Sequence, residues 1–164
     1  MLNRVLKALA ALRKKPEFIR SAPQEGVLYM SHFTDNPPYP WYWPNFAPHE
    51  LASKGNGTVN IEYRAINLLQ KLRREWGRPL RVNSAYRDPA YNKKVGGAKR
   101  SKHMEGKAFD ISVVGWTEEE KEEFKELAYT IGFRGFGGYG TFIHIDISTP
   151  RRWGQRWAWP EDLK

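Results

Sequence analysis

The alternation of apolar and polar residues is strictest in TFIHIDIS, residues 141–148. A period of two sends the three isoleucines to one face of a strand and sends His144 and Asp146 to the other face, about 7 Å apart along the strand. The segment AFDISVV, residues 108–114, alternates in the same way and places Asp110 opposite its branched residues. Both segments are therefore predicted to be strands with one buried face and one face that carries potential ligands.

Two other segments have the apolar period of a helix. The first is predicted to begin after Asn60 and to end at Gly77, since a glycine there suits the left-handed turn that ends many helices. The second opens with a capping box formed by Thr117 and Glu120, and it ends at Gly132. The residues predicted to face inward are Ile61, Ala65, Leu68, Leu69, Leu72 and Trp76 in the first helix, and Phe124, Leu127, Ala128 and Ile131 in the second.

The order helix, strand, strand, helix, strand predicts an α+β fold in which a small antiparallel sheet is flanked by helices. The remaining strand of this order is LRVNSAY, residues 80–86. These elements are assigned to a domain over residues 46–150. Residues 1–45 are assigned to a short amphipathic helix and an extended segment rich in proline and aromatic residues, and residues 151–164 to a basic aromatic tail.

Two features that precede the domain each have more than one interpretation. The amphipathic helix in the first fifteen residues is predicted to pack on the domain, with docking on a membrane surface or a partner protein as the alternative. The aromatic cluster Tyr39, Trp41, Tyr42 and Trp43 is predicted to cover the core, with a role as a substrate wall as the alternative.

Composition narrows the chemistry. The 164 residues include 27 lysines and arginines against 18 acidic residues, so an anionic partner such as nucleic acid, anionic lipid or bacterial cell wall is favoured. There is no cysteine, which excludes disulfides, thiolate metal sites and a cysteine nucleophile. No segment has the pattern of a signal peptide or a membrane span. Because cysteine is absent, any metal must be held by histidine or carboxylate side chains.

Four histidines are present, of which His32 and His49 are predicted to be non-ligands. A zinc ion that keeps one position open for water takes three protein ligands, commonly two histidines and a carboxylate. His103, Asp110 and His144 supply such a set. Each also has a simpler explanation, because a single histidine is often only hydrogen-bonded and a strand aspartate often pairs with an arginine.

Two runs of the sequence resemble the zinc D-alanyl-D-alanine carboxypeptidase family, which includes bacterial and phage peptidoglycan peptidases and shares its fold with the hedgehog signalling domain. They are VNSAYRDPAYNKKVGGAKRSKHMEGKAFDI, residues 82–111, and GYGTFIHIDIS, residues 138–148. The first contains Ser-x-Tyr-Arg followed by Ser-x-His-x-x-Gly-x-Ala-x-Asp, and the second supplies a strand histidine. The resemblance extends from about Phe46 to Ile147.

This resemblance implies one zinc ion per chain, with His103, Asp110 and His144 as its ligands. It also implies that Arg87 binds the carboxylate of the substrate or the developing oxyanion, and that Ser101 lies beside the site. A planar guanidinium suits the role of Arg87 because it can hold a carboxylate by two parallel hydrogen bonds. The alternative for Arg87 is a surface ion pair, for example with Asp88. Tyr86 is a further candidate for substrate binding, with a purely structural place in the strand as the alternative, and Tyr139 is predicted either to reach the pocket or to belong to the core.

The general base is not settled by the resemblance. Several branches of the family carry a carboxylate three residues before the last zinc histidine or a histidine two residues before it, and these positions are Thr141 and Phe142 here. Asp146 is the candidate base, because it shares a face with His144 and a carboxylate near zinc can accept a proton. The alternative is that Asp146 orients a zinc ligand or pairs with an arginine.

The sequence therefore predicts a zinc metallopeptidase that hydrolyses peptidoglycan stem peptides, either as a carboxypeptidase or as an endopeptidase. Seven basic and two acidic residues between Arg87 and Lys107 suit an anionic wall. The lack of an export signal points to an endolysin-type phage or prophage enzyme, which reaches the wall after lysis or on a virion-like particle. The alternative is a non-catalytic wall-binding component of a phage tail or similar particle. Nucleic-acid binding leaves the metal set unexplained and is not predicted.

Overall fold

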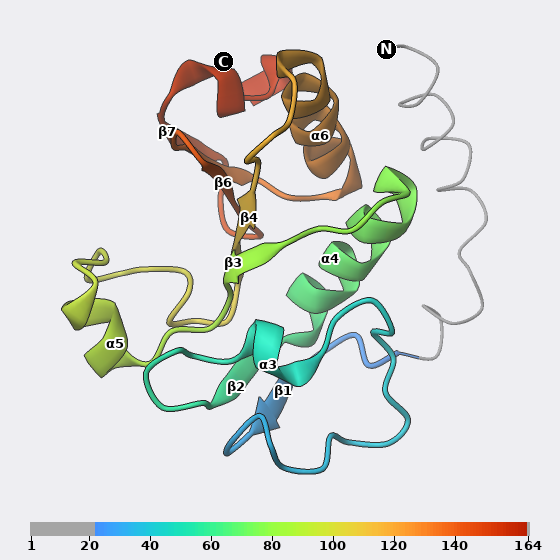
Figure 1. Ribbon diagram of the computed structural model, residues 1–164, viewed down its shortest axis with the longest axis vertical. Helices are drawn as coiled ribbons and strands as arrows, with labels where there is room; N and C mark the ends of the chain where they lie inside the picture. The colour runs from blue at the N-terminus through green and yellow to red at the C-terminus, as the bar shows by residue number, and fades with distance from the viewer. Residues whose placement is uncertain (1–21, 164) are drawn as a thin grey trace.

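A five-stranded sheet organises the computed structural model, which describes residues 22–163 (Figure 1). Its strands, in spatial order, are β3 (Val82–Ser84), β4 (Ala108–Ser112), β6 (Phe142–Asp146), β5 (Gly135–Gly138) and β7 (Arg151–Gly154). All neighbouring strands are antiparallel except β5 and β7, which are parallel. The predicted α+β class and the three predicted strands are confirmed, while β5 and β7 were not predicted.

A separate two-stranded sheet corrects the predicted start of the first long helix. Strand β1 (Val27–Met30) pairs antiparallel with β2 (Val59–Glu62), so Ile61 lies in a strand. Helix α4 (Tyr63–Trp76) therefore begins at Tyr63 and not directly after Asn60. The physical reason is that residues 59–62 alternate between buried and half-buried positions, and pairing with β1 satisfies their backbone groups as a strand.

Helix α6 (Glu118–Ile131) packs against α4. The predicted capping box of Thr117 and Glu120 is present, and Gly77 ends α4 with a left-handed φ of 77°. All the residues predicted to face inward are buried except Leu68, which is partly buried against the core. Trp76 stacks on Trp116 with ring centroids 5.0 Å apart, so the ends of the two helices share an aromatic contact.

Short elements complete the chain. They are α3 (Pro48–Leu51), α5 (Pro89–Lys94), and the two 3-10 turns η1 (Arg156–Ala158) and η2 (Glu161–Leu163). Helix α5 is capped by Asp88, whose side chain accepts a hydrogen bond of 3.0 Å from the backbone N–H of Tyr91. None of the helices within residues 22–163 has the length and apolar content needed to span a bilayer.

The segments assigned to the two ends of the chain are part of the same structure. Strand β1 pairs with β2, and β7 forms the edge of the main sheet while η1 packs against α6. Residues 22–45 and 151–163 are therefore continuous with the domain predicted over residues 46–150. The predicted amphipathic helix of residues 1–15 lies outside the described residues.

The aromatic cluster before the domain divides into buried and exposed members. Trp43 is 2% exposed and its indole N–H donates to Asn67 at 2.8 Å, whereas Tyr39 is 97% exposed. Trp41 and Tyr42 are partly buried against the core. The predicted cover over the core is thus provided by Trp41, Tyr42 and Trp43, and Tyr39 takes no part in it.

Candidate metal centre and its cavity

One row of residues crosses all five strands of the main sheet. In spatial order it consists of Ser84, Asp110, His144, Gly137 and Trp153, each in register with the next. Asp110 and His144 are direct partners on the antiparallel strands β4 and β6. The shared polar face predicted from the alternation of each strand is therefore a single surface, with two potential ligands side by side.

His103 reaches this surface from the loop between α5 and β4. Its Nδ1 lies 2.6 Å from the carbonyl oxygen of Ala85, and its own carbonyl accepts from the backbone N–H of Arg87 at 3.2 Å. The loop turns at Gly106, which has a φ of 67° and where a Cβ would lie 2.2 Å from the carbonyl oxygen of Asn60. This position admits glycine only, and the tight turn holds His103 in place at 2% exposure.

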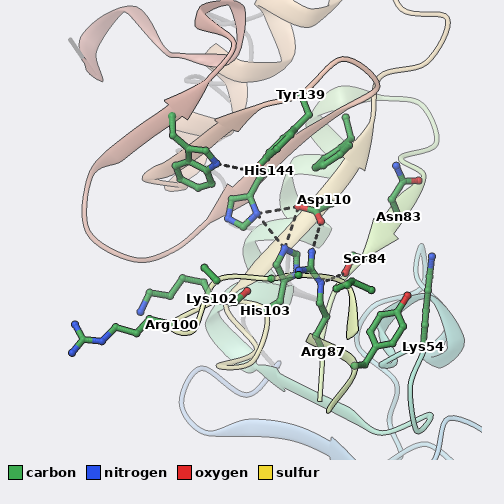
Figure 2. Close-up of a pocket in the computed structure, with 18 of the residues that line it drawn as sticks. Lys54, Asn83, Ser84, Arg87, Arg100, Lys102, His103, Asp110, Tyr139 and His144 are labelled. Carbon is green, nitrogen blue, oxygen red and sulfur yellow. Dashed lines mark hydrogen bonds and ion pairs between the residues drawn. The ribbon is translucent and has the colours of Figure 1, made fainter. Parts of the chain in front are cut away.

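The three predicted ligands meet in a triangle (Figure 2). His103 Nε2 lies 3.1 Å from Asp110 Oδ1 and 3.1 Å from His144 Nδ1, and the third side, between His144 Nδ1 and Asp110 Oδ1, is 3.0 Å. All three residues are buried. Ligands at about 2.0 Å around a tetrahedral zinc ion are separated by roughly 3.3 Å, so the triangle is close to one face of such a site.

Each histidine has one ring nitrogen in the triangle and one that faces away from it. The hydrogen bonds of the nitrogens that face away show where each imidazole carries its proton. A carbonyl oxygen can only accept, so His103 carries its proton on Nδ1, facing Ala85. His144 Nε2 lies 2.9 Å from Asp146 Oδ2, so its proton faces that carboxylate. The neutral imidazoles therefore point lone pairs at each other and at Asp110. Such an arrangement of acceptors requires a shared proton or a cation.

The pKa shifts of the three residues reflect the same convergence of acceptor atoms. Burial lowers the pKa of His103 and outweighs the opposing effect of Asp110. Burial also acts to lower the pKa of His144, but its hydrogen bonds with Asp110 and Asp146 outweigh burial and raise it. The pKa of Asp110 is lowered, because the two histidines outweigh its burial. In the absence of a metal, these directions favour the protonated form of His144 and the charged form of Asp110.

Arg87 touches the second oxygen of Asp110. Its Nη2 donates to Asp110 Oδ2 at 2.8 Å, and its Nε donates to Ser84 Oγ at 2.9 Å. The side chain is 15% exposed and lines the cavity. Arg87 thus orients a candidate metal ligand, while Nη1 has no partner among residues 22–163. The alternative partner, Asp88, instead caps α5 and accepts from Ser53.

Asp146 lies behind His144, on the side away from the triangle. It is 0% exposed, and Oδ2 also accepts from Arg151 Nη2 at 2.6 Å. The other oxygen accepts from the backbone N–H of Ser148 at 2.9 Å and from the hydroxyl of Ser148. These hydrogen bonds outweigh burial and lower the pKa of Asp146. Asp146 does not line the cavity in front of the triangle.

That cavity has a volume of about 640 Å³ and a strongly basic lining. Five cationic side chains line it, and among the described residues Asp110 is its one carboxylate. The cations are Lys54, Arg87, Arg100, Lys102 and Arg151. Ser101 lines the cavity, whereas Tyr86 does not and packs instead against the core. Tyr39, Trp41, Tyr42 and Trp43 are also absent from the lining, so the cluster does not form a substrate wall here.

Sequence reasoning found one side of the cavity only in part. Tyr139, predicted either to reach the pocket or to belong to the core, lines the cavity from the turn between β5 and β6, and Phe142 lines it from the first position of β6. Trp153 and Arg151, which line it from β7, were not predicted. The signal that could have found them is the glycine-rich segment before TFIHIDIS. Glycines at successive strand positions leave room for side chains from the neighbouring strands to lie across them.

Comparison with known families agrees with this geometry. The family model described as Peptidase M15 matches residues 44–146, which include His103, Asp110 and His144. The chain belongs to the peptidase M15 family. A separate comparison with curated proteins found no match. The resemblance seen in the sequence is thereby confirmed, and family membership implies peptidase activity. In this M15 peptidase the matched region ends at Asp146, so β7 and its cavity-lining residues lie beyond it.

Proposed function

We propose that this M15 peptidase is a zinc enzyme that hydrolyses peptidoglycan stem peptides, with one zinc ion held by His103, Asp110 and His144. The observation that carries the proposal is the convergence of three buried acceptor atoms 3.0–3.1 Å apart, with the outer nitrogens of both histidines fixed by other groups. Two histidines and one carboxylate are a ligand set typical of catalytic zinc sites, in which the fourth coordination position stays open for water or substrate.

When bound, the zinc ion would supply a Lewis acid for the scissile carbonyl and lower the pKa of a water molecule towards about 7. The other tasks fall to side chains. Arg87 keeps Asp110 in place through Nη2 and offers Nη1 to a carboxylate or carbonyl oxygen of the substrate. Ser84 fixes the guanidinium by accepting from Nε, so the group is held before the substrate arrives.

Asp146 is proposed to be a positioning residue for His144. Its full burial, its contact with the nitrogen that faces away from the triangle, and its absence from the cavity lining all support this role over that of general base. A carboxylate that accepts from a ligating histidine fixes the ring and raises its basicity as a ligand.

The charge of the cavity supports an anionic peptide as substrate. Lys54 and Arg100 are exposed, line the cavity, and have no ion-pair partner among residues 22–163. Stem peptides carry free carboxylates, which these cations and Arg87 could bind. Whether the bond cut is terminal, as in a carboxypeptidase, or internal to the stem stays a prediction to be tested. A phage or prophage source likewise stays a prediction.

One observation favours a second candidate, a wall-binding module without turnover. Among the described residues that line the cavity, Asp110 is the one carboxylate and it is engaged in the triangle. Within residues 22–163, no second carboxylate is therefore placed to take a proton from water. Such a module would still bind stem peptides through its basic lining, and it would serve a phage tail or similar particle that holds the wall.

A digest of purified peptidoglycan separates the two candidates. The protein is incubated with the wall with and without a chelator, and the products are identified by mass spectrometry. Chelator-sensitive release of D-alanine supports a carboxypeptidase, and cut stem peptides support an endopeptidase. Absence of product from several wall types, in a protein that binds stoichiometric zinc, overturns the enzymatic proposal in favour of the binding module.

A further inference from the structure

Tyr139 and Trp153 form a hydrogen-bonded pair on the side of the cavity opposite Arg87. Figure 2 shows Tyr139 and Arg87 on either side of the triangle. The indole N–H of Trp153 donates to the hydroxyl oxygen of Tyr139 at 2.9 Å. Tyr139 stacks on Phe142 with ring centroids 4.3 Å apart and an interplanar angle of 11°. The phenol is therefore held by a face contact and by a hydrogen bond.

The direction of this hydrogen bond leaves the tyrosine proton unused. An indole nitrogen can only donate, so the hydroxyl of Tyr139 must be the acceptor. The hydroxyl keeps one proton of its own, and that proton has no acceptor among residues 22–163. Tyr139 is 40% exposed and lines the cavity. The hydrogen bond from Trp153 fixes the position of the Tyr139 oxygen, and the hydroxyl proton is free to be donated to a group in the cavity.

The fold makes specific room for the tryptophan. Trp153 lies in register with Gly137, and a Cβ on Gly137 would come within 2.4 Å of the indole ring. The indole therefore lies across a strand position that has no side chain, and its ring centroid is 4.9 Å from that of His144. The parallel pairing of β7 with β5 thus places this side chain beside a candidate metal ligand.

We propose that Tyr139, Phe142 and Trp153 form a second substrate-binding surface, in which the hydroxyl of Tyr139 donates a hydrogen bond to a carbonyl or carboxylate oxygen of the bound peptide. Trp153 is a positioning residue that acts through this hydroxyl. Arg87 and Tyr139 then hold acceptor oxygens on opposite sides of the metal centre. The proposal rests on the proposed function, since it takes the substrate to be a peptide.

The test is a double-mutant cycle on kcat/KM for a soluble stem pentapeptide, using wild type, Tyr139→Phe, Trp153→Phe and the double variant in the zinc-loaded full chain. Each single substitution keeps an aromatic ring and removes one member of the hydrogen bond. Tyr139→Phe is expected to lower kcat/KM about tenfold, and Trp153→Phe about threefold. The double variant is expected to match Tyr139→Phe, because Trp153 has no effect once the hydroxyl is gone.

Two controls use the same substitutions away from the cavity. Tyr29→Phe, on β1, and Trp157→Phe, whose indole N–H donates to Gln155, should each leave kcat/KM unchanged within twofold. Zinc stoichiometry should be unchanged in all variants. An effect of Tyr139→Phe below twofold, or strictly additive effects in the double variant, would overturn the proposal while leaving peptidase activity established.

A binding measurement keeps this result separate from the proposed hydrolysis. Calorimetric titration of the same pentapeptide gives a dissociation constant for each of the four proteins, whether or not the peptide is cut. Wild type could bind the peptide without cutting it, and the dissociation constants of the four proteins could still show the non-additive pattern expected of the cycle. That result would overturn the proposed hydrolysis and support the second substrate-binding surface. If wild type does not bind the peptide at all, the second surface is overturned as well.

Discussion

The two histidines of the candidate metal centre are held by different parts of the molecule. His103 sits in a loop and its outer nitrogen bonds a main-chain carbonyl, that of Ala85. His144 sits in the central strand β6 and its outer nitrogen bonds the buried side chain of Asp146, which Arg151 of β7 holds in turn. One candidate ligand thus depends on the path of the backbone, and the other depends on two further side chains. Substitutions should therefore affect the two sides of the site unequally.

The largest effect is expected where the two sides meet. His103→Ala and His144→Ala each remove a member of the triangle, so each should abolish stoichiometric zinc binding and lower the hydrolysis rate by at least about 10³-fold. Zinc content by mass spectrometry, together with muropeptide release, measures both. His49→Ala, in α3 and outside the triangle, is the matched control. Stoichiometric zinc in His144→Ala would refute the ligand assignment.

The next largest effect is expected for Asp146, the side chain that contacts the outer nitrogen of His144. Asp146→Asn keeps the shape but removes the charge that His144 Nε2 and Arg151 contact, so zinc affinity should fall about 10- to 100-fold. Activity should return when zinc is supplied in excess. Competition with a chelating dye measures the affinity. Activity that stays low at saturating zinc would instead make Asp146 the general base.

The matched substitution on the other side of the site is Ala85→Gly. It leaves in place the carbonyl oxygen that His103 Nδ1 contacts, so zinc affinity should change less than about threefold. Stability should fall by about 0.5–1 kcal/mol, because glycine loses more conformational freedom on folding. Urea unfolding measures the stability change. A loss of zinc affinity as large as that of Asp146→Asn would remove the proposed difference between the two histidines.

A smaller effect, on stability, is expected where β5 separates β6 from β7. Gly137→Ala places a Cβ against the ring of Trp153, which should cost about 1–3 kcal/mol of stability and displace the indole from His144. Gly140→Ala is the control, because a Cβ there meets nothing within 4 Å. Urea unfolding of both variants measures the difference. Equal stability of the two would show that β7 does not pack against β5 in this way.

A small effect is also expected for Arg151→Gln. The side chain of Arg151 is 40% exposed, so solvent partly screens its ion pair with the buried carboxylate of Asp146. Zinc affinity should fall by less than about fivefold, and the difference from wild type should shrink at high salt. A loss as large as that of Asp146→Asn would show that the pair, and not the carboxylate alone, positions His144.

The local patterns of the sequence determined much of the fold and of the candidate metal centre. Strict alternation identified β4 and β6 and placed Asp110 and His144 on polar faces, because side-chain direction in a strand depends only on position. The capping box and the terminal glycines located the ends of α6 and the end of α4 for the same local reason. The resemblance to the zinc D-alanyl-D-alanine carboxypeptidase family then joined His103 to the other two candidate ligands.

Only the tertiary structure decided how the remaining parts of the cavity come together. Strand β5 has the sequence GFGG, which lacks the branched residues typical of strands, and its pairing with β7 is non-local. The roles of Asp146, Tyr139 and Trp153 depend on which residues lie opposite them across that sheet. Strand register is set by packing and hydrogen bonds between distant segments, so a single sequence predicts which face a residue takes but not which neighbour it meets there.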